Sequence, residues 1–337
     1  MSQVGHLPFF LADPRCEVAA VAETRPSLVQ ALSQEPRIGR IVARHHDILA
    51  DPTIDAVVIS VPRGATAPIT LEALTAGKHV LAEKPMALTL DDARQLVDAA
   101  RSRKLIYAVG FMKRYDPGVQ AARTAFQDIS AQGRLGRVLL ARFYNFSKVY
   151  AVAPPTHTRP TESRAERFPE SAAAPAWLPA ALLPNYAWFL NAASHDLNLM
   201  RYFFPGALSV QAASSPSDGA VSALLSHGAT PVHLEVAKSA IGVWREGAEF
   251  LFENGCLSLE IPSPMAVDQV ARVTVEENAG GYQCRVLETQ RGWCFARQVE
   301  GFIDALAGTS QPLASGEDSL GDMVLNDVLW RKIAEVA

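Results

Sequence analysis

Short apolar runs alternate with helical stretches along the first third of the chain. The pattern predicts strands at residues 17–22, 54–62, 79–81 and 106–111, and those at 54–62 and 79–81 are expected to be buried. A helix is expected over 65–75, ending before Gly77, and another after Thr89, which opens a capping-box pattern. Strands and helices in this order predict a doubly wound parallel sheet of Rossmann type, which is an α/β fold.

The pattern changes after Pro117. Residues 137–145 alternate as a half-buried antiparallel strand does, and strand follows strand from 207 to 287. The pairs Asn254-Gly255 and Gly280-Gly281 are hairpin turn signals. We therefore expect a Rossmann-like domain at 1–117 and an α+β domain at 118–337 with a large open antiparallel sheet. The helices at 295–307 and 318–335 are expected to pack back and close the fold.

Two stretches of the second domain differ from the strands around them. Residues 151–184 are rich in Pro and Ala and carry His157 and three arginines, so they form either a functional lid or a disordered segment. The basic residues there face an anionic substrate or are simply solvated. Residues 186–205 read as one helix, on which Asn191 and His195, four apart, would share a face.

Composition narrows the functional classes. A chain of 337 residues is long enough for two cores, and a net charge of −4 argues against a nucleic-acid binder. The four cysteines show no metal-binding spacing, which fits a reducing cytoplasm. We expect no signal peptide, because the start of the chain lacks a basic region and is broken by Pro8 and Asp13. No apolar run approaches the ~20 residues of a membrane span. His45 and His46 are adjacent and would point about 100° apart on a helix, so no metal site is expected.

Candidate chemistry gathers where the strand at 79–81 ends. That strand delivers Glu83, Lys84 and Pro85 to the edge where open α/β sheets bind ligands. Oxidation of an alcohol by a nicotinamide requires a cation that holds the substrate oxygen and a group that moves the hydroxyl proton. Lys84 suits the first role. His195 suits the second, because the unperturbed pKa of histidine, ~6.5, lies near working pH.

Four motifs together resemble the Gfo/Idh/MocA oxidoreductase family over nearly the whole chain. They are Asp55-Ala-Val-Val-Ile, Ala76-Gly-Lys-His-Val, Glu83-Lys-Pro and His195-Asp-Leu-Asn-Leu-Met-Arg. The stretch Gly110-Phe-Met-Lys-Arg-Tyr-Asp is most similar to the inositol-dehydrogenase branch. The resemblance implies a catalytic set of Lys84, His195 and a carboxylate four residues before the histidine, where this chain has Asn191. Either His195 then acts without that carboxylate, or Asp196 substitutes for it from a different helix face. The resemblance also implies a cis Lys84–Pro85 bond.

The expected cofactor is NAD, with NADP left open. Glu23 follows the second strand of the fold and would accept hydrogen bonds from the ribose hydroxyls, whereas Arg25 could pair with a 2′-phosphate. The expected cofactor-binding residues are Gly5, Glu23, Arg25, Ser60, Pro62, Arg63, Glu83 and Lys84. The expected substrate-binding residues are Lys113, Arg114, Tyr115, Tyr186 and Asn191.

Two functions of different class follow. The first is an NAD(P)-dependent oxidoreductase that acts on a hydroxyl or carbonyl carbon of a sugar, a cyclitol or a similar small molecule. The second is a non-catalytic nucleotide- or metabolite-binding regulatory or scaffold protein derived from this family. In either case we expect a homodimer or homotetramer through the open face of the antiparallel sheet, because that face needs a cover.

The start of the chain departs from the dinucleotide-binding pattern. Such folds open with a strand and Gly-x-Gly-x-x-Gly, whereas here a helix comes at once. With Gly5 as the third glycine, Ser2 occupies the second position. We expect that an upstream first strand is missing from this sequence, and that the sheet has a gap or a rearranged centre.

Overall fold

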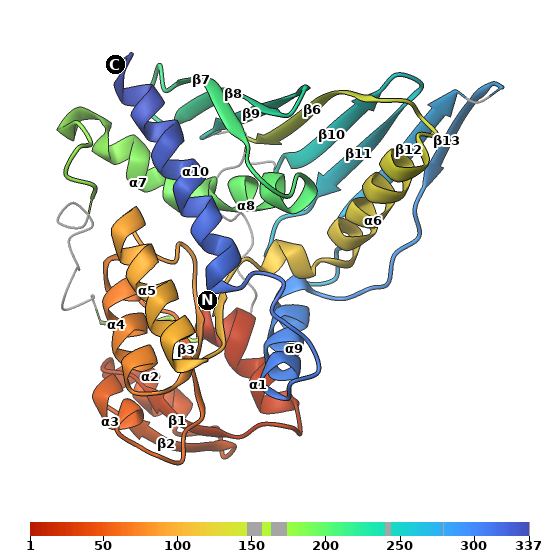
Figure 1. Cartoon of the computed structure of the whole chain (residues 1–337). Helices are drawn as coiled ribbons and strands as arrows, with labels where there is room; N and C mark the ends of the chain where they lie inside the picture. The colour runs from red at the N-terminus through yellow and green to blue at the C-terminus, as the bar shows by residue number, and fades with distance from the viewer. Residues whose placement is uncertain (147–156, 163–173, 240–243, 279, 337) are drawn as a thin grey trace. The chain divides into compact units, whose positions relative to one another are not determined.

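The computed structural model describes residues 1–146, 157–162, 174–239, 244–278 and 280–336 (Figure 1). The chain divides into two compact units, and each is made of three segments. Unit 1 comprises Met1–Gly110, Pro154–Ala173 and Phe295–Leu320. Unit 2 comprises Phe111–Ala153, Ala174–Cys294 and Gly321–Ala337. The domain boundary at residue 117 stays a prediction.

Unit 1 is built from parallel strands and the helices that connect them. In chain order its elements are η1 (Ser2–His6), α1 (Leu7–Ala12), β1 (Val18–Ala22), α2 (Pro26–Leu32), β2 (Ile38–Val42), α3 (His45–Leu49), β3 (Ala56–Ile59), α4 (Arg63–Thr75), β4 (His79–Ala82), α5 (Leu90–Arg103), β5 (Tyr107–Val109) and α9 (Cys294–Leu306). The helix α10 (Gly316–Ala334) begins in unit 1 and ends in unit 2.

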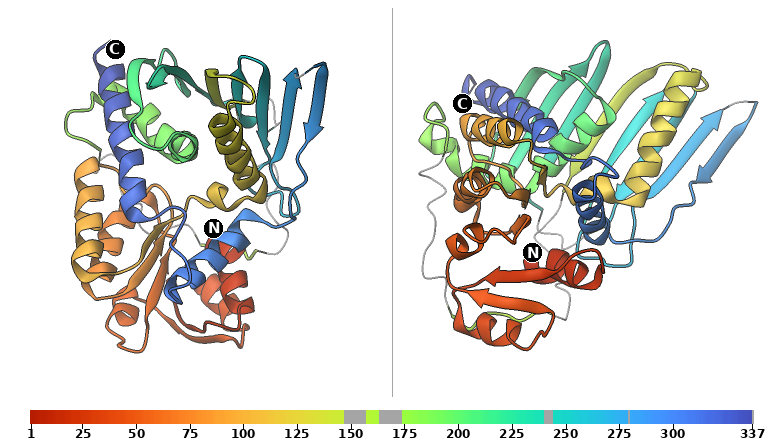
Figure 2. Two further views of the ribbon diagram at one scale, coloured as in Figure 1. Left: turned by 45° about the vertical axis from the view of Figure 1, so that its right-hand side comes forward. Right: turned by 60° about the horizontal axis from the view of Figure 1, so that its bottom comes forward.

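The five parallel strands of unit 1 form two sheets (Figure 2). One sheet has the order β1-β2 and the other β3-β4-β5, and all of their pairings are parallel. In consequence β1 and β3 are both edge strands. The prediction that β3 is buried is wrong, because Val58 is exposed and only Ile59 is buried. β1 is likewise half-buried to exposed, whereas β4 lies in the centre and is nearly fully buried. That a strand precedes Met1 stays a prediction.

Residues within a few positions of each helix end determine where α4 ends and where α5 begins in unit 1. Gly77 ends α4 with a φ of +81°, a left-handed conformation that favours a residue without Cβ. The side chain of Thr89 accepts a hydrogen bond from the amide of Asp92 and caps α5. Lys78 is buried, and its ammonium donates to the carbonyl oxygens of Asp51 and Ile54 at 2.6 and 2.8 Å. The lysine of the Ala-Gly-Lys-His-Val motif is therefore structural.

Unit 2 is built around one eight-stranded sheet. Its elements are η2 (Met112–Tyr115), α6 (Pro117–Gln132), β6 (Val138–Asn145), η4 (Ala180–Leu182), α7 (Leu183–Ala192), α8 (Ser194–Phe203), β7 (Ser209–Ser214), β8 (Ala220–His227), β9 (Thr230–Ala237), β10 (Glu246–Phe252), β11 (Gly255–Ile261), β12 (Arg272–Asn278) and β13 (Tyr282–Val286). The strand order is β13-β12-β11-β10-β6-β9-β8-β7. The sequence predicts an antiparallel sheet, but β6 pairs with β9 in parallel, since β6 follows α6 and is not joined to β9 by a hairpin.

Both predicted hairpins of this sheet are confirmed. β10 and β11 form the first hairpin, in which Glu253 and Asn254 make the turn and Gly255 begins β11, one residue earlier than the predicted turn at Asn254-Gly255. β12 pairs antiparallel with β13 across the glycine turn. Gly280 and Gly281 adopt φ values of +83° and +140°, which L side chains rarely reach. The mixed pattern of local turns and one parallel pairing gives the large, mostly antiparallel sheet that the sequence predicts.

An aromatic core joins the sheet of unit 2 to its helices. Phe126 of α6 lies 4.6 Å, centroid to centroid, from Phe250 of β10, and Phe203 of α8 lies 4.8 Å from the same ring. Phe143 of β6 meets Phe250 edge-on at 5.6 Å. Figures 1 and 2 show α6 and α8 against this one face of the sheet.

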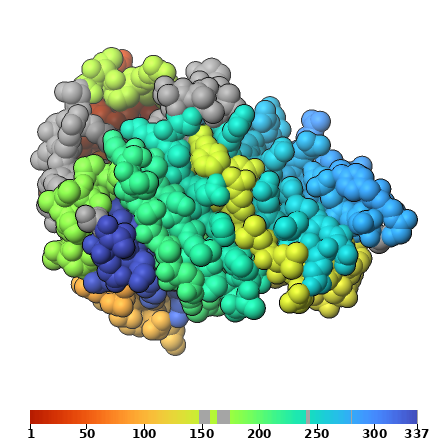
Figure 3. All heavy atoms as spheres, turned by 90° about the horizontal axis from the view of Figure 1, so that it is seen from above, coloured from red at the N-terminus to blue at the C-terminus, as the bar shows by residue number. Residues whose placement is uncertain are grey.

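The other face of the sheet carries a mixed row of side chains. Across four strands, Leu224, His233, Arg142 and Glu249 lie side by side in register. Arg142 pairs with Glu235 at 2.7 Å and Leu251 is 46% exposed. Figure 3 looks onto strands of this sheet, with no described helix laid across them.

Among the described residues, no helix is both long and apolar enough to cross a membrane.

Candidate active site

The Glu83-Lys84-Pro85 segment directly follows β4, the central strand of its sheet. Oε1 of Glu83 lies 2.7 Å from Nε2 of His6, and the His6 side chain is buried. On another side Glu83 packs against Gly110, where an added Cβ would come within 3.1 Å of the Glu83 Cα. The Lys84–Pro85 bond is cis, which confirms the prediction. Glu83 is thus held in place immediately before the half-buried Lys84.

Glu83 carries a negative charge at neutral pH. Burial by itself raises the pKa of Glu83, but the hydrogen bond with His6 and the charges of His6, Lys84 and the amino terminus outweigh it, so the pKa is lowered. An ionised, buried carboxylate therefore precedes the proposed catalytic lysine.

Gly5, predicted to be the third glycine of a phosphate loop, lies in η1 against a phenyl ring. An added Cβ would lie only 2.7 Å from Cδ1 of Phe295 in α9. His6 meets the same ring edge-on, with centroids 5.9 Å apart. The absence of a side chain at Gly5 thus admits Phe295, and its role toward a cofactor stays a prediction.

The acidic residue expected at the end of β1 is in place and already paired. Both carboxylate oxygens of Glu23 are bound by the Arg25 guanidinium, at 2.9 and 2.7 Å, and Oε1 also accepts the backbone amides of Thr24 and Arg25. Burial tends to raise the pKa of Glu23, but the hydrogen bonds and charge of Arg25 prevail and lower it. Glu23 is therefore an anion whose charge Arg25 balances.

Ser60, Pro62 and Arg63 follow β3 and begin α4. Because β3 and β4 run parallel, these residues lie at the same edge of the sheet as Lys84. All three are half-buried. Their placement agrees with the expected cofactor edge, and their contact with a cofactor stays a prediction.

The helix predicted over 186–205 is two helices. The chain breaks at Ala193, whose φ and ψ of −96° and −2° end α7 and precede α8. Asn191 is exposed at the end of α7, whereas His195 is buried in the first turn of α8 and meets Phe111 edge-on at 5.6 Å. The inference that Asn191 and His195 share one helix face is therefore wrong, because a 3.6-residue period does not continue across the break.

The predicted substrate-binding residues of unit 2 are largely buried. Arg114 donates to the carbonyl oxygen of Asn198 at 2.9 Å and stacks over Tyr202. Tyr115 is 6% exposed, and Tyr186 packs edge-on against Trp330 at 5.3 Å. Burial raises the pKa of Tyr186. These side chains hold unit 2 together, and their roles toward a substrate stay predictions.

Sequence reasoning missed a buried polar cluster around Asp196. Glu246 pairs with Lys113, and its other oxygen accepts Nε1 of Trp244 at 3.1 Å. Asp196, adjacent to His195 in the chain, accepts Nδ2 of Asn145 at 3.1 Å. Burial and the charge of Glu246 raise the pKa of Asp196 to about 8, against the opposing charge of Lys113. Glu246 and Trp244, which lie well over 100 residues after Lys113, carry no local signal that could have revealed this cluster.

The prediction that His45 and His46 cannot face one ligand is also wrong. Nε2 of His45 lies 2.7 Å and Nε2 of His46 3.3 Å from the same oxygen, Oε2 of Glu72. The two rings lie 4.0 Å apart and 34° from parallel, because they swing toward each other from the first turn of α3.

The carboxyl ends of the parallel strands fit a nicotinamide dinucleotide at two points. Glu23 offers a carboxylate where ribose hydroxyls would bind, and the segment after β4 offers Lys84 beside an ionised Glu83. At Gly5, by contrast, the described part of the chain shows packing against Phe295 and no group that would hold a cofactor. The donor set therefore suits the ribose and the reacting end of the cofactor.

Comparison with known proteins agrees with this assignment. Residues 1–111 match the family model described as "Oxidoreductase family, NAD-binding Rossmann fold", the Gfo/Idh/MocA model. The 1,5-anhydro-D-fructose reductase of Ensifer adhaerens is 37% identical over 141 residues, which are 42% of this chain and 40% of that protein. Inositol 2-dehydrogenase of Salmonella typhimurium is 31% identical over 137 residues, 40% of each chain. The aligned part thus spans about 40% of the length of these two curated relatives.

Solved structures match over nearly the whole chain. A 3-ketoreductase from Actinomadura kijaniata, solved with NADP and TDP-benzene, superposes with a TM-score of 0.74 at 22% identity and covers 98% of this chain and 94% of its own. Levoglucosan dehydrogenase, solved with NADH and levoglucosan, gives a TM-score of 0.75 at 18% identity, with 98% and 92% covered. At these identities the likeness establishes the fold. Residues 1–111 of this chain are thus similar to the NAD-binding Rossmann part of the Gfo/Idh/MocA oxidoreductases.

Proposed function

We propose that this protein is an NAD(P)-dependent oxidoreductase acting on a hydroxyl or carbonyl carbon of a sugar, a cyclitol or a similar small molecule. The observation that carries the proposal is Lys84, which follows the central strand of its sheet within a segment that matches an NAD-binding oxidoreductase model. Glu83, fixed by His6, supports it. The named relatives, an anhydrofructose reductase and an inositol dehydrogenase, suggest the substrate class.

In the proposed reaction each side chain has one task. A nicotinamide dinucleotide, when bound, would supply the hydride chemistry. The Lys84 ammonium holds the substrate oxygen and stabilises negative charge on it as the hydroxyl proton leaves. Glu83, ionised and buried, places a negative charge beside Lys84, and the charge of Lys84 in turn helps to lower the pKa of Glu83.

His195 moves the hydroxyl proton. Its imidazole is buried at the start of α8 and is positioned by Phe111. Asn191 can hydrogen-bond to the substrate but cannot accept a proton, so His195 acts without a carboxylate at that position. Substrate hydroxyls are proposed to meet Asn191 and Tyr186, with Lys113, Arg114 and Tyr115 shaping the site from η2.

The cofactor is proposed to be NAD rather than NADP. Arg25 is held by two hydrogen bonds from its guanidinium to Glu23, so a 2′-phosphate would have to compete with that carboxylate and would also be repelled by it. We expect calorimetry to show NAD binding at least ~10-fold more tightly, a difference of about 1.4 kcal/mol. Glu23→Gln, which retains the shape but not the charge, should reduce this preference. Tighter binding of NADP by the unaltered protein would contradict it.

The protein is also proposed to assemble through the sheet of unit 2 and to work in the cytoplasm. Leu224 and Leu251 are exposed on a sheet face that also carries the paired Arg142 and Glu249, a mixture suited to a second copy. The thiols of all four cysteines are free, as a reducing compartment would keep them. A small-molecule substrate, rather than a nucleic acid, remains the proposed partner of the site.

The direct test is absorbance at the reduced-nicotinamide band with a panel of polyols and keto-sugars. Turnover of any member by the unaltered protein, with loss in Lys84→Ala, supports the proposal. The alternative, a non-catalytic nucleotide-binding protein, would be supported by a different result. The protein would then bind the dinucleotide but turn over no member of the panel, and His195→Ala would bind the dinucleotide as the unaltered protein does.

A further inference from the structure

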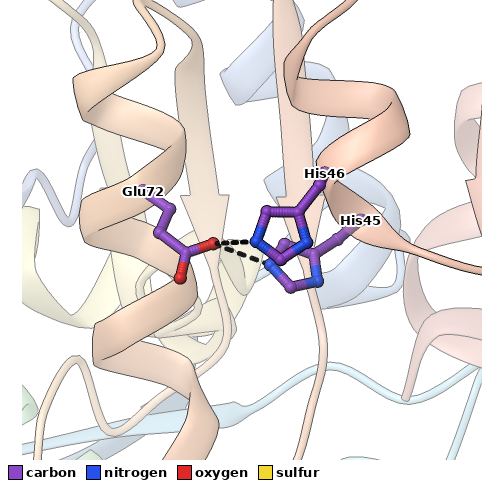
Figure 4. A group of neighbouring side chains, drawn as sticks. All are labelled: His45, His46 and Glu72. Carbon is purple, nitrogen blue, oxygen red and sulfur yellow. Dashed lines mark hydrogen bonds and ion pairs between the residues drawn. The ribbon is translucent and has the colours of Figure 1, made fainter.

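Three metal-ligating side chains of unit 1 converge at one point away from the residues assigned above. They come from two helices: His45 and His46 from the first turn of α3, and Glu72 from the last turn of α4. Their ligand atoms all lie within 4.8 Å of one another. Figure 4 shows both imidazole rings turned toward the same carboxylate.

Two of the three distances between the ligand atoms are near those found around a bound transition-metal ion, and the third is at most 4.8 Å. Ligand atoms bound to zinc lie ~2.0–2.2 Å from it, so neighbouring ligands in a tetrahedron are roughly 3.3–3.5 Å apart. Nε2 of His46 is already 3.3 Å from Oε2 of Glu72. Nε2 of His45 is 2.7 Å from that oxygen and would need to move by only about 0.6 Å.

The chemistry of the ligands selects the class of metal. Two imidazoles and one carboxylate suit Zn²⁺ and its neighbours among the divalent transition metals, whereas Mg²⁺ and Ca²⁺ prefer oxygen ligands alone. With neutral imidazoles the three groups carry a net charge of −1, which favours a divalent cation. The adjacent Arg44 does not oppose it strongly, because its guanidinium pairs with Asp47 at 2.8 Å.

The partial exposure of the three side chains leaves a path for the ion. The side chains of His45, His46 and Glu72 are 33%, 63% and 45% exposed. A metal here would have three protein ligands, with water completing the tetrahedron. It would also link α3 to α4 across β3, which separates them in the chain.

We propose that His45, His46 and Glu72 form a zinc-binding site that ties α3 to α4. The site is independent of the oxidoreductase reaction, because none of its ligands is among the residues assigned to the cofactor or the substrate. Zinc binding therefore stabilises unit 1 rather than taking part in hydride transfer.

The test is calorimetric titration of the untagged, chelator-treated full-length protein with ZnCl₂. The unaltered protein should bind one Zn²⁺ saturably, and its melting temperature should rise with added zinc. His45→Ala, His46→Ala and Glu72→Gln should each weaken binding by at least ~10-fold, since even the loss of residues behind a metal's ligands costs roughly 10–100-fold. His227→Ala, which removes a half-buried imidazole of unit 2, is the matched control and should bind as the unaltered protein does.

Either of two results would overturn the proposal. The first is no saturable binding by the unaltered protein, which would leave the three side chains as a hydrogen-bonded cluster. The second is equal binding by all three ligand variants, which would place zinc on the thiols or elsewhere. Circular dichroism of each variant shows that it is folded, and the visible spectrum of a Co²⁺ complex, present in the unaltered protein and lost in Glu72→Gln, gives a second readout.

Discussion

In each unit, a buried carboxyl group lies next to a proposed catalytic residue. The pKa of one of these carboxyl groups is lowered and that of the other is raised. Glu83 precedes Lys84 in unit 1, and its pKa is lowered because His6 and nearby positive charges outweigh burial. Asp196 follows His195 in unit 2, and its pKa is raised to about 8 by burial and by the charge of Glu246. Burial is common to both groups, so their neighbours decide which form each carries.

This difference assigns distinct electrostatic surroundings to the two catalytic residues. Lys84 has the anion Glu83 beside it in the chain. His195 has a neutral acid beside it at pH 7, because a carboxyl with a pKa of about 8 is mostly protonated there. Asp196 and Glu246 interact with each other, and Lys113 pairs with Glu246. When Asp196 holds a proton, the charge of Lys113 balances that of Glu246, and no unbalanced negative charge remains.

Removing the cation itself should have the largest effect. Lys84→Ala is expected to lower kcat/KM by roughly 10²–10⁴-fold or more, because the substrate oxygen loses its charged partner. Steady-state kinetics measures this loss, and the melting temperature shows whether the fold is kept. Lys104→Ala, a change at the exposed end of α5, is the matched control. A Lys84→Ala enzyme with near-normal kcat/KM would remove Lys84 from the mechanism.

The raised pKa of Asp196 predicts a pH-dependent stability. Folded protein holds this proton up to about pH 8, whereas an unfolded Asp releases it near ~3.9, so the free energy of unfolding falls as pH rises between these values. The limiting slope is on the order of 1 kcal/mol per pH unit. Asp196→Asn, which resembles the protonated acid and retains an acceptor for Asn145, should flatten this slope.

Urea unfolding at several pH values measures that slope. Asn145→Asp, which replaces the amide donor by a further carboxyl group, should steepen it and serves as the opposite variant. An unaltered slope in Asp196→Asn would show that Asp196 is ionised in the folded protein.

The lowered pKa of Glu83 predicts the opposite dependence. Its stabilisation is full above the unfolded pKa of ~4.3 and is lost as pH falls through the lower folded value. His6→Ala should reduce the free energy of unfolding by about 1–3 kcal/mol at pH 7, the cost of a buried group without its hydrogen bond. The acid-induced loss of stability should also begin at higher pH. A His6→Ala protein with the same free energy of unfolding as the unaltered protein, both at pH 7 and in acid, would contradict the assigned role of His6.

The smallest effect is expected at Asn191. Asn191→Asp should raise the oxidation rate by up to about 10-fold, because a carboxylate can take the proton or increase the basicity of His195. Asn191 and His195 lie on different helices, so the expected increase in rate does not require them to share a helix face. Rates of oxidation and reduction measured separately test it, with Asn185→Asp as a control on the same helix. No change in either rate would exclude Asn191 from the proton path.

The sequence predicts what local signals determine. The end of α4 at Gly77, the cap of α5 at Thr89 and the two glycine hairpins follow from backbone preferences within a few residues. The edge position of Lys84 follows from the order of strands and helices, and the resemblance to a known family adds the cis bond.

Features that depend on distant residues could not be predicted in the same way. The convergence of His45 and His46 depends on Glu72, which another helix supplies. The buried pair of Lys113 and Glu246 joins η2 to a strand 133 residues later. The split of the parallel strands into two sheets likewise depends on what packs between them, which apolar runs alone do not specify.

Direct transfer of hydrogen is the central claim, and an isotope label tests it. The protein is incubated with a panel of keto-sugars and reduced nicotinamide that carries deuterium at the transferred position, and the products are analysed by mass spectrometry. The account predicts a product with one deuterium on the new carbinol carbon from the unaltered protein, and little or none from Lys84→Ala. Products free of deuterium, or equal labelling by the unaltered protein and Lys84→Ala, would contradict it.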